Sequence, residues 1–299
     1  MSMLLPYGAR AISLGQALTA RPSADALFFN PAGLVGLPSD EFLVHHARTF
    51  EGQNNVFTLL LQSRVIGAVG LTFLMVDLGE TEITTGGGQT TGTLAIRHQA
   101  LIASFATPVG AGLRAGVNYK LYNEMTERSA TTHMIDVGAQ YTAERLGGLE
   151  LGAAITHLGF KLQVVNAEQA DQTPARLRVG AAYELGKHVF ADSSITLWVS
   201  ADGLSRLLPL DDDDATGADR PGTARGLSFA GNVGVEVGFD ETLFVRAGYA
   251  STGDGLVRGG TGIGVGINYD RFQVAVAKGF SQSALDTGDP FQITFRVGF

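Results

Sequence analysis

The C-terminal stretch Phe291-Gln292-Ile293-Thr294-Phe295-Arg296-Val297-Gly298-Phe299 decides the fold class, because its odd positions are apolar and its even positions are polar or glycine. Successive side chains of a β-strand point to opposite faces, so this stretch has one apolar and one polar face. The same period of two recurs at 113–121, 135–141, 149–153, 177–183, 195–199, 233–239, 243–249, 263–269 and 272–276. The chain is therefore predicted to be all-β.

A soluble β-sandwich alternates in the same way, so other features must choose between it and a membrane barrel. The polar face is rich in glycine, which suits a lumen that holds other parts of the chain. Several strands end their apolar face in an aromatic residue, as an interfacial girdle requires; these residues are Tyr141, Tyr183, Phe239, Tyr249, Tyr269 and Phe299. Both features favour the barrel.

The predicted connections alternate in length. Short turns are expected near 62–65, 109–111, 144–148, 239–241 and 269–271, with a middling one at 186–192. Longer links are expected at 78–94, 123–131, 159–173, 204–224, 251–259 and 281–289. Short periplasmic turns that alternate with longer outer loops are typical of outer-membrane barrels. Counting further strands at 41–49, 56–62, 65–77 and 97–108, we predict a transmembrane antiparallel barrel of about fourteen strands.

Composition excludes several classes of protein. The chain has no cysteine, which removes thiolate catalysis and cysteine-bound metal sites, and its net charge of −8 argues against a nucleic-acid partner. No apolar run approaches the roughly 18 residues of a membrane helix. The first residues lack the basic start and apolar run of a signal peptide, so a bacterial outer-membrane location implies that such a peptide was removed.

Residues 1–40 do not alternate and are predicted to form an N-terminal plug or periplasmic segment, with the barrel at 41–299. Ser23 could cap one helical turn, which Asn30-Pro31 would end, because proline disfavours helix in the residue before it. The terminal Phe299 is expected to be the signal that the barrel-assembly machinery recognises; the alternative is an ordinary last strand.

The N-terminal residues resemble the signature of the PorV/PorQ family, within the FadL-like group of outer-membrane barrels. The positions that carry this resemblance are Gly8, Ala9, Arg10, Gly15, Asn30, Pro31, Ala32, Gly33 and Leu34. It implies a fourteen-strand barrel with the N-terminal segment in or under the lumen. It also implies an accessory of type IX-like protein secretion or surface attachment, with exported proteins as partners. Two alternatives are a FadL-like transporter of hydrophobic small molecules and a structural barrel that anchors a surface assembly.

Charged residues of both signs fall on the polar, lumen-facing phase of the strands: Arg114, Lys120, Asp136, Glu150, Arg178, Asp202, Glu236, Arg246 and Arg296. Enclosed charges must pair or be hydrated. They could form ion pairs that hold the plug and lumen closed, or line a selective path for a polar solute. Both readings stay open here.

The sequence predicts no enzyme and no cofactor. The Gly226–Gly231 stretch is one residue too long for a nucleophile elbow, and Gly262, Gly264 and Gly266 line one face of a strand. The six histidines show no metal spacing, and adjacent His45 and His46 should point to opposite faces. Weak candidates for a cation site are Asp211, Asp212, Asp213 and Asp214, although such a cluster is more often a solvated loop. The predicted partners are outer-membrane lipid, the assembly machinery and either exported proteins or a hydrophobic ligand.

Overall fold

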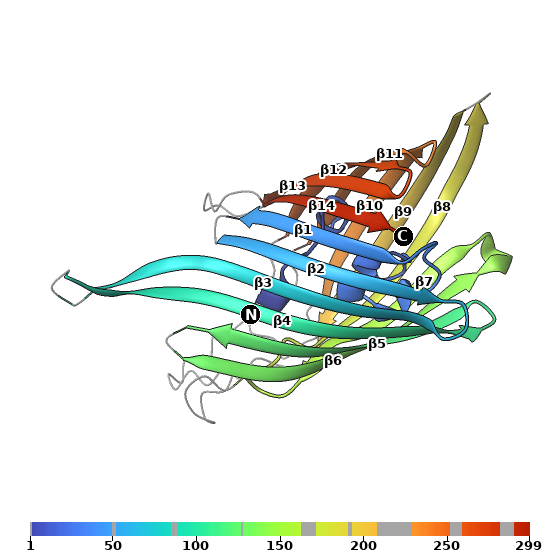
Figure 1. Ribbon diagram of the computed structural model, residues 1–299. Helices are drawn as coiled ribbons and strands as arrows, with labels where there is room; N and C mark the ends of the chain where they lie inside the picture. The colour runs from blue at the N-terminus through green and yellow to red at the C-terminus, as the bar shows by residue number, and fades with distance from the viewer. Residues whose placement is uncertain are drawn as a thin grey trace, which may run out of the picture.

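The computed structural model describes residues 2–49, 52–84, 86, 89–126, 128–162, 172–190, 193–207, 229–251, 259–281 and 290–299. Within them, fourteen strands form one closed antiparallel barrel (Figure 1), which confirms the predicted fold class and strand number. The strands are β1 (Glu41–Thr49), β2 (Gly52–Ser63), β3 (Gly67–Thr84), β4 (Thr90–Gly110), β5 (Leu113–Met125), β6 (Ser129–Ala143), β7 (Leu149–Gly159), β8 (Arg176–Phe190), β9 (Ser193–Arg206), β10 (Phe229–Phe239), β11 (Leu243–Ala250), β12 (Gly260–Tyr269), β13 (Phe272–Ser281) and β14 (Phe291–Gly298). In the described part of the chain, no helix has the length and apolar character needed to cross a membrane.

The stretch that decided the fold class is the strand that closes the barrel. β14 pairs with β13 on one side and with β1 on the other, from Glu41 opposite Gly298 to Arg48 opposite Phe291. Phe291, Ile293 and Phe295 are 38–44% exposed, whereas Gln292 and Thr294 are 2–3% exposed. A sandwich would bury those apolar side chains between two sheets. Their exposure on the outside of a closed barrel means that they face lipid.

The predicted alternation of connection lengths is wrong for part of the chain. The expected long link at 78–94 is mostly strand, since β3 continues to Thr84 and β4 begins at Thr90; the links at 123–131 and 186–192 are shortened in the same way. The ends of β3 and β4 form a hairpin that projects past the neighbouring strands (Figure 1). This projecting part is rich in threonine and charged residues. The polar residues of this hairpin mark the end of the apolar belt that faces lipid, although the two strands continue beyond it.

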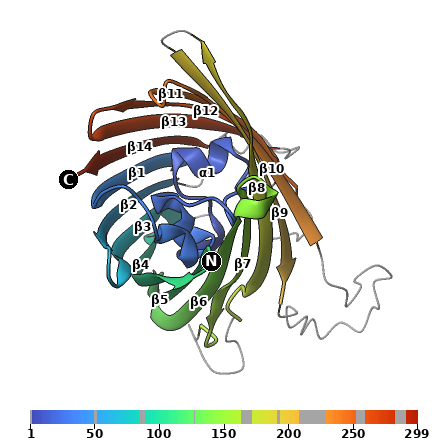
Figure 2. The ribbon, with the colours of Figure 1, turned by 90° about the vertical axis from the view of Figure 1, so that its right-hand side faces the viewer.

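The N-terminal segment lies inside the barrel (Figure 2). It contains α1 (Ala9–Ser13) and three short 3-10 helices, η1 (Ser2–Leu4), η2 (Ala24–Phe28) and η3 (Pro31–Leu34); a fourth, η4 (Glu144–Leu146), follows β6. α1 packs on β11–β14, and η3 packs on β4–β6. Most residues from Ser2 to Val35 are buried, so the enclosed core of this protein is the contact between the N-terminal segment and the inner wall.

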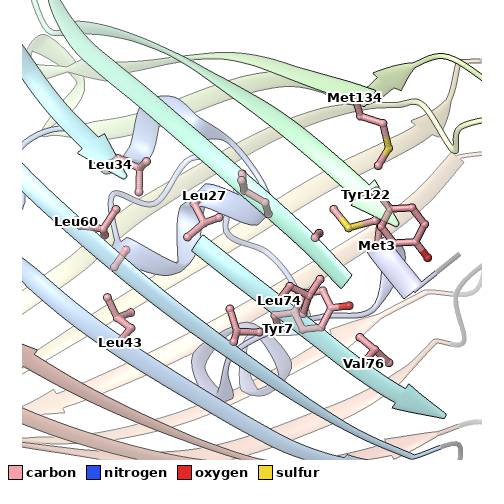
Figure 3. Packing of buried hydrophobic residues seen from close by; sticks show 14 of the residues in the cluster. Met3, Tyr7, Leu27, Leu34, Leu43, Leu60, Leu74, Val76, Tyr122 and Met134 are labelled. Atoms are coloured by element: carbon pink, nitrogen blue, oxygen red, sulfur yellow. The ribbon is translucent and has the colours of Figure 1, made fainter. Parts of the chain in front are cut away.

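The inner face of the first strands is more apolar than the sequence pattern predicts. Met3, Tyr7 and Leu27 of the N-terminal segment pack with inward-facing side chains of β1–β6 (Figure 3), including Leu43, Leu60, Leu74, Val76, Tyr122 and Met134. Because this part of the wall is apolar on both faces, β2 and β3 show near-continuous apolar runs in place of clean alternation.

The helical turn expected after Ser23 is present, but Ser23 does not cap it as predicted. η2 begins after Ser23, but the Ser23 side chain makes no capping hydrogen bond. Asn30 starts the next helix, η3, because its side chain accepts a hydrogen bond from the Ala32 amide and Pro31 occupies the first helical position. Asn30-Pro31 therefore both ends one turn and begins another.

Candidate functional site

A row of glycines on the inner wall receives α1 and the residues after it. Gly234, Gly248, Gly262 and Gly279 are successive cross-strand partners on β10, β11, β12 and β13. A Cβ added to Gly234 would lie 2.6 Å from the Leu14 carbonyl oxygen, and the backbone of Ile12 or Leu14 would likewise meet a Cβ at Gly262 or Gly248. Glycine at these positions lets the backbone of the segment lie against the backbone of the wall.

Two further glycine pairs receive other parts of the segment. Gly116 and Gly138, partners on β5 and β6, contact Asn30 and Pro31. Gly152 and Gly180, partners on β7 and β8, lie against Thr19. The glycine-rich inner face expected from the sequence is thus concentrated where the N-terminal segment touches the wall.

Several of the residues that carry the predicted PorV/PorQ resemblance fall at these contacts. Gly15 has a φ of 58°, and a Cβ there would lie 2.5 Å from the Tyr249 amide nitrogen, so both its conformation and its space require glycine. The Asn30 side chain donates to the carbonyls of Thr19 and Ala139, which ties the segment to itself and to β6. Ala9, Ala32, Gly33 and Leu34 are buried, and the Ala9 amide donates to Thr294.

One buried carboxylate joins the segment to β10 and β11. Glu236 contacts Arg10 at 3.2 Å and Arg21 at 2.8 Å from the N-terminal segment, and Arg246 at 2.5 Å from β11. The guanidinium of Arg21 also stacks 4.1 Å from the ring centre of Trp198 on β9. Two arginines of the segment are therefore fixed by a single acidic group of the wall.

A second carboxylate holds the turn after α1. Asp202 on β9 accepts hydrogen bonds from the backbone amides of Leu18 and Thr19 and, at 2.6 Å, from the Thr19 hydroxyl. Arg178 on β8 lies 3.1 Å from the same carboxylate and also donates to the Gln16 carbonyl. Arg178 Nε also donates to the Thr19 hydroxyl, so an ion pair is combined with five hydrogen bonds between wall and segment.

The polarity is reversed at the third contact, because the segment supplies the carboxylate. Asp25 in η2 lies 3.0 Å from Arg296 on β14, and His45 on β1 is 3.6 Å away. Arg296 also reaches Glu41 at 3.5 Å. Burial alone would raise the pKa of Asp25, but the positive charges around it, led by Arg296, hold that pKa below its ordinary value.

A fourth cluster connects the segment to an irregularity in β7. Asp136 on β6 accepts from Lys120 at 2.6 Å, from Asn118 at 2.8 Å and from the His157 amide at 2.8 Å. Asn118 also donates to the Leu27 carbonyl of the segment at 2.7 Å. The ammonium of Lys120 is fully buried and lies 3.3 Å from His157 Nδ1. We call Asn118, Lys120, Asp136 and His157 the Asp136 cluster.

At the Asp136 cluster, β7 contains a bulge. The register between β6 and β7 shifts by one residue between Ile135 and Val137, and His157 has a φ of 59°. Both Thr156 and His157 are buried, although neighbours in a regular strand point to opposite faces. The bulge therefore turns an extra side chain into the lumen.

A small cavity of about 20 Å³ lies between the bulge and the start of the N-terminal segment. Its apolar lining includes Met3, Leu4, Leu5, Phe28 and Phe29, and its polar lining comprises Gln16, Thr156, His157, Arg176 and Arg178. A space of this size accommodates one water molecule.

The remaining predicted positions are placed as follows. Arg114 pairs with Glu150 at 2.6 Å on the inner wall. His45 is buried and His46 exposed, as predicted from alternation. Phe299 follows β14 and is exposed. Its role as an assembly signal stays a prediction. Asp211–Asp214 lie outside the described residues, and among those that are described no group of three His, Asp or Glu side chains could hold a metal ion.

Sequence reasoning missed several members of these clusters. Thr19, Arg21 and Asp25 were not singled out, because the segment shows no periodicity that assigns a direction to its side chains. The bulge at His157 has no sequence signal either, since the strand continues on both sides of it with ordinary residues.

Comparisons with known proteins were made over the whole chain. No family model matches the sequence, and no curated protein matches it. Among solved structures, the Pseudomonas putida toluene transporter TodX is 11% identical with a TM-score of 0.63, covering 98% of each chain. The CymD monoaromatic hydrocarbon channel is 13% identical with a TM-score of 0.63, covering 99% of this chain and 98% of its own. A Pseudomonas aeruginosa FadL homologue is 11% identical with a TM-score of 0.52, covering 99% of both.

At these identities the likeness concerns the fold alone. The PorV/PorQ resemblance stays a prediction that these comparisons do not support. The described residues form a fourteen-strand barrel, and the fold of the chain is similar to that of the FadL homologue and of the two hydrocarbon channels over nearly their whole length.

Proposed function

We propose that this chain is an outer-membrane conduit for small hydrophobic molecules and that its N-terminal segment is the gate. The observation that carries the proposal is the position of that segment. It occupies the lumen, lies against glycines of the wall and leaves a cavity with an apolar side next to the β7 bulge. An open water-filled porin has no such occupant.

The apolar side of the cavity supports a hydrophobic solute. Met3, Leu4 and Leu5 form one side of it, and Phe28 and Phe29 add aromatic surface. A hydrocarbon the size of toluene does not fit into about 20 Å³, so residues 2–6 must move during transport. Residues 2–6 are tied to the wall by a long hydrogen bond of 3.3 Å between the Ser2 Oγ and the Tyr122 hydroxyl and by one of 2.7 Å from Gln292 to the Pro6 carbonyl, and both must break for this part to move.

The β7 bulge supports a route through the side of the barrel. A bulge interrupts the regular ladder between β6 and β7. The Asp136 cluster joins this irregular place to the Leu27 carbonyl of the segment through Asn118. We infer that movement of the segment changes the hydrogen bonds that hold the bulge. A hydrophobic molecule would then leave sideways, between β6 and β7, into the lipid.

The charges of the inner wall support closure of the lumen better than selection of a polar solute. Glu236 and Asp202 accept bonds from both wall and segment. Asp136 holds Asn118, which donates to the Leu27 carbonyl of the segment. Replacing Arg246 with alanine leaves Glu236 with two arginine partners. Ion conductance of the variant in a planar bilayer should therefore equal that of the wild type, and a change would favour a selective polar channel.

The solved structures of similar fold also support transport, since they include a toluene transporter and a monoaromatic hydrocarbon channel. They agree with the FadL-like alternative made from the sequence. They offer no support for the secretion accessory, for which copurification of exported proteins is the test.

Toluene uptake by cells that lack other hydrocarbon channels tests the proposal. A Thr156→Phe variant places an aromatic ring in the cavity, and its matched control, Thr131→Phe, adds the same ring on the exposed side of β6. We expect uptake with the wild type and the control, and uptake near background with Thr156→Phe. Equal uptake by both variants, at equal amounts of folded barrel, would overturn the proposed route.

A further inference from the structure

Two residues in an uncommon backbone conformation line the cavity beside the β7 bulge. Gln16 of the N-terminal segment has a φ of 65°, and His157 of the bulge has a φ of 59°. This left-handed conformation is strained for residues other than glycine, and such strain concentrates at functional sites and ligand clamps. The segment and the wall thus each place a strained residue at the same cavity.

The polar side of this cavity is held in place. The Gln16 amide donates to the Ala11 carbonyl at 2.8 Å, and the Gln16 carbonyl accepts from Arg178 at 2.9 Å. Thr156 belongs to β7 of the wall. Most of the apolar side, in contrast, belongs to residues 2–6, which must move to admit a solute. When they withdraw, the polar side stays and contacts the solute.

This polar side can both donate and accept hydrogen bonds. Gln16 and Thr156 are 9% and 1% exposed, and within the described residues neither side chain has a hydrogen-bond partner. An amide and a hydroxyl each offer a donor and an acceptor. His157 Nδ1 lies 3.3 Å from the Lys120 ammonium, which only donates, so Nδ1 accepts and Nε2 of the neutral ring carries the proton. A ligand group that both donates and accepts matches this set.

The volume of the cavity matches one small polar group. About 20 Å³ accommodates a water molecule, and a hydroxyl group has a similar size, whereas a carboxylate is larger. A methyl group in the same place would leave Gln16 and Thr156 buried without hydrogen bonds, which weakens binding. The body of the solute would lie against Phe28 and Phe29, in the space that residues 2–6 vacate.

We propose that the preferred solute of this barrel is a small aromatic molecule with a hydroxyl group, and that this hydroxyl binds to Gln16 and Thr156. The inference rests on the transport function proposed above. It goes further, because it separates hydroxylated solutes from plain hydrocarbons of the same shape and assigns that discrimination to two residues.

Competition for toluene uptake tests the preference. Cells that lack other hydrocarbon channels take up labelled toluene in the presence of 4-methylphenol or p-xylene, which have the same shape and differ by a hydroxyl in place of a methyl group. The test variant, Gln16→Met/Thr156→Val, keeps the side-chain shapes and removes their hydrogen bonding. Its matched control, Gln99→Met/Thr131→Val, makes the same changes on the outer side of β4 and β6.

The quantity to compare is the ratio of the two competitor concentrations that halve uptake. Partition into lipid is a property of the competitors, so it affects every variant equally. We expect 4-methylphenol to be at least ten times the better inhibitor for the wild type and the control, and this advantage to disappear in the test variant. Heat-modified migration on gels confirms that each variant is a folded barrel, and the wild-type comparison depends on no variant.

The contrary outcomes are distinct. Toluene uptake that both competitors inhibit equally in the wild type would overturn the hydroxyl preference and leave the transport function standing. An unchanged advantage of 4-methylphenol in the test variant would overturn the assignment to Gln16 and Thr156. Stronger inhibition by 4-methylbenzoate than by 4-methylphenol would overturn the choice of a hydroxyl over a carboxylate. Absence of toluene uptake by the wild type would overturn the transport function, and this inference with it.

Discussion

Replacing Gly234 with alanine should loosen the N-terminal segment while the barrel stays intact. The added Cβ would lie 2.6 Å from the Leu14 carbonyl oxygen, whereas ordinary contact begins at 3.4 Å, so wall and segment must separate by up to 0.8 Å (3.4 − 2.6). Overpacking of this kind costs about 1–3 kcal/mol, which raises the population of the displaced segment about 5- to 150-fold.

Thiol labelling measures that population. The chain has no cysteine, and Ser13 is 1% exposed, so Ser13→Cys introduces a single buried thiol beside Leu14. Its rate of reaction with a charged maleimide reports how often the segment leaves the wall. The control is Gly231→Ala, on the same strand, where an added Cβ meets no atom within 4 Å.

We expect labelling to be faster by the factor above in the Gly234→Ala background and unchanged in the Gly231→Ala background. Heat denaturation of the barrel should be similar for both variants. If the two backgrounds label at the same rate, the glycine row does not fix the segment, and the reasoning from close backbone contact is refuted.

Three other predictions concern the buried polar groups. Asp136→Asn leaves the buried Lys120 ammonium without its carboxylate, so thermal denaturation should show a loss of about 3–5 kcal/mol; an unchanged midpoint would contradict the assigned pair. Thr19→Val removes a 2.6 Å hydrogen bond to a carboxylate and should destabilise docking of the segment by about 1–3 kcal/mol, read from labelling at Ser13→Cys. The lowered pKa of Asp25 means that its ion pair stabilises the fold above the ordinary carboxyl pKa and is lost as pH falls through the lowered value. Fluorescence of Trp198, the one tryptophan of the chain, should therefore stay constant from neutral pH down to about pH 4 and change only below it; a transition near pH 6 would contradict this.

The fold could be predicted from the sequence because its strongest physical constraint is local. A strand between lipid and lumen must alternate, and Phe291–Phe299 does so without interruption. The same rule correctly placed the inward charges, such as Glu236 and Arg246, since position within a strand fixes the face.

The alternation of apolar and polar residues predicts the strands less well where a strand does not have lipid on one face and a polar lumen on the other. β2 and β3 are apolar on both faces, because Leu60 and Leu74 pack against the N-terminal segment. β3 and β4 also run further than predicted, since threonine suits a strand whether or not lipid surrounds it.

The candidate site needed the three-dimensional structure. The partners of Glu236 include Arg10 and Arg21, which are more than 200 positions away in the sequence. Nothing in the composition of the N-terminal segment indicates which of its side chains meets which strand. The glycine-rich inner face, the lack of alternation in residues 1–40 and the family resemblance predicted that the lumen would be occupied, but not by which contacts.

A reversible cross-link between the N-terminal segment and the wall tests the central claim, that the segment must move for transport. Ser2 and Glu124 each have a side-chain oxygen 3.3 Å from the Tyr122 hydroxyl, so Ser2→Cys/Glu124→Cys can be joined by a short, cleavable bismaleimide. We predict that toluene uptake by cells carrying this variant stops on cross-linking and returns on cleavage, while each single-cysteine variant is unaffected by the reagent. Undiminished uptake by the fully cross-linked barrel would contradict the account.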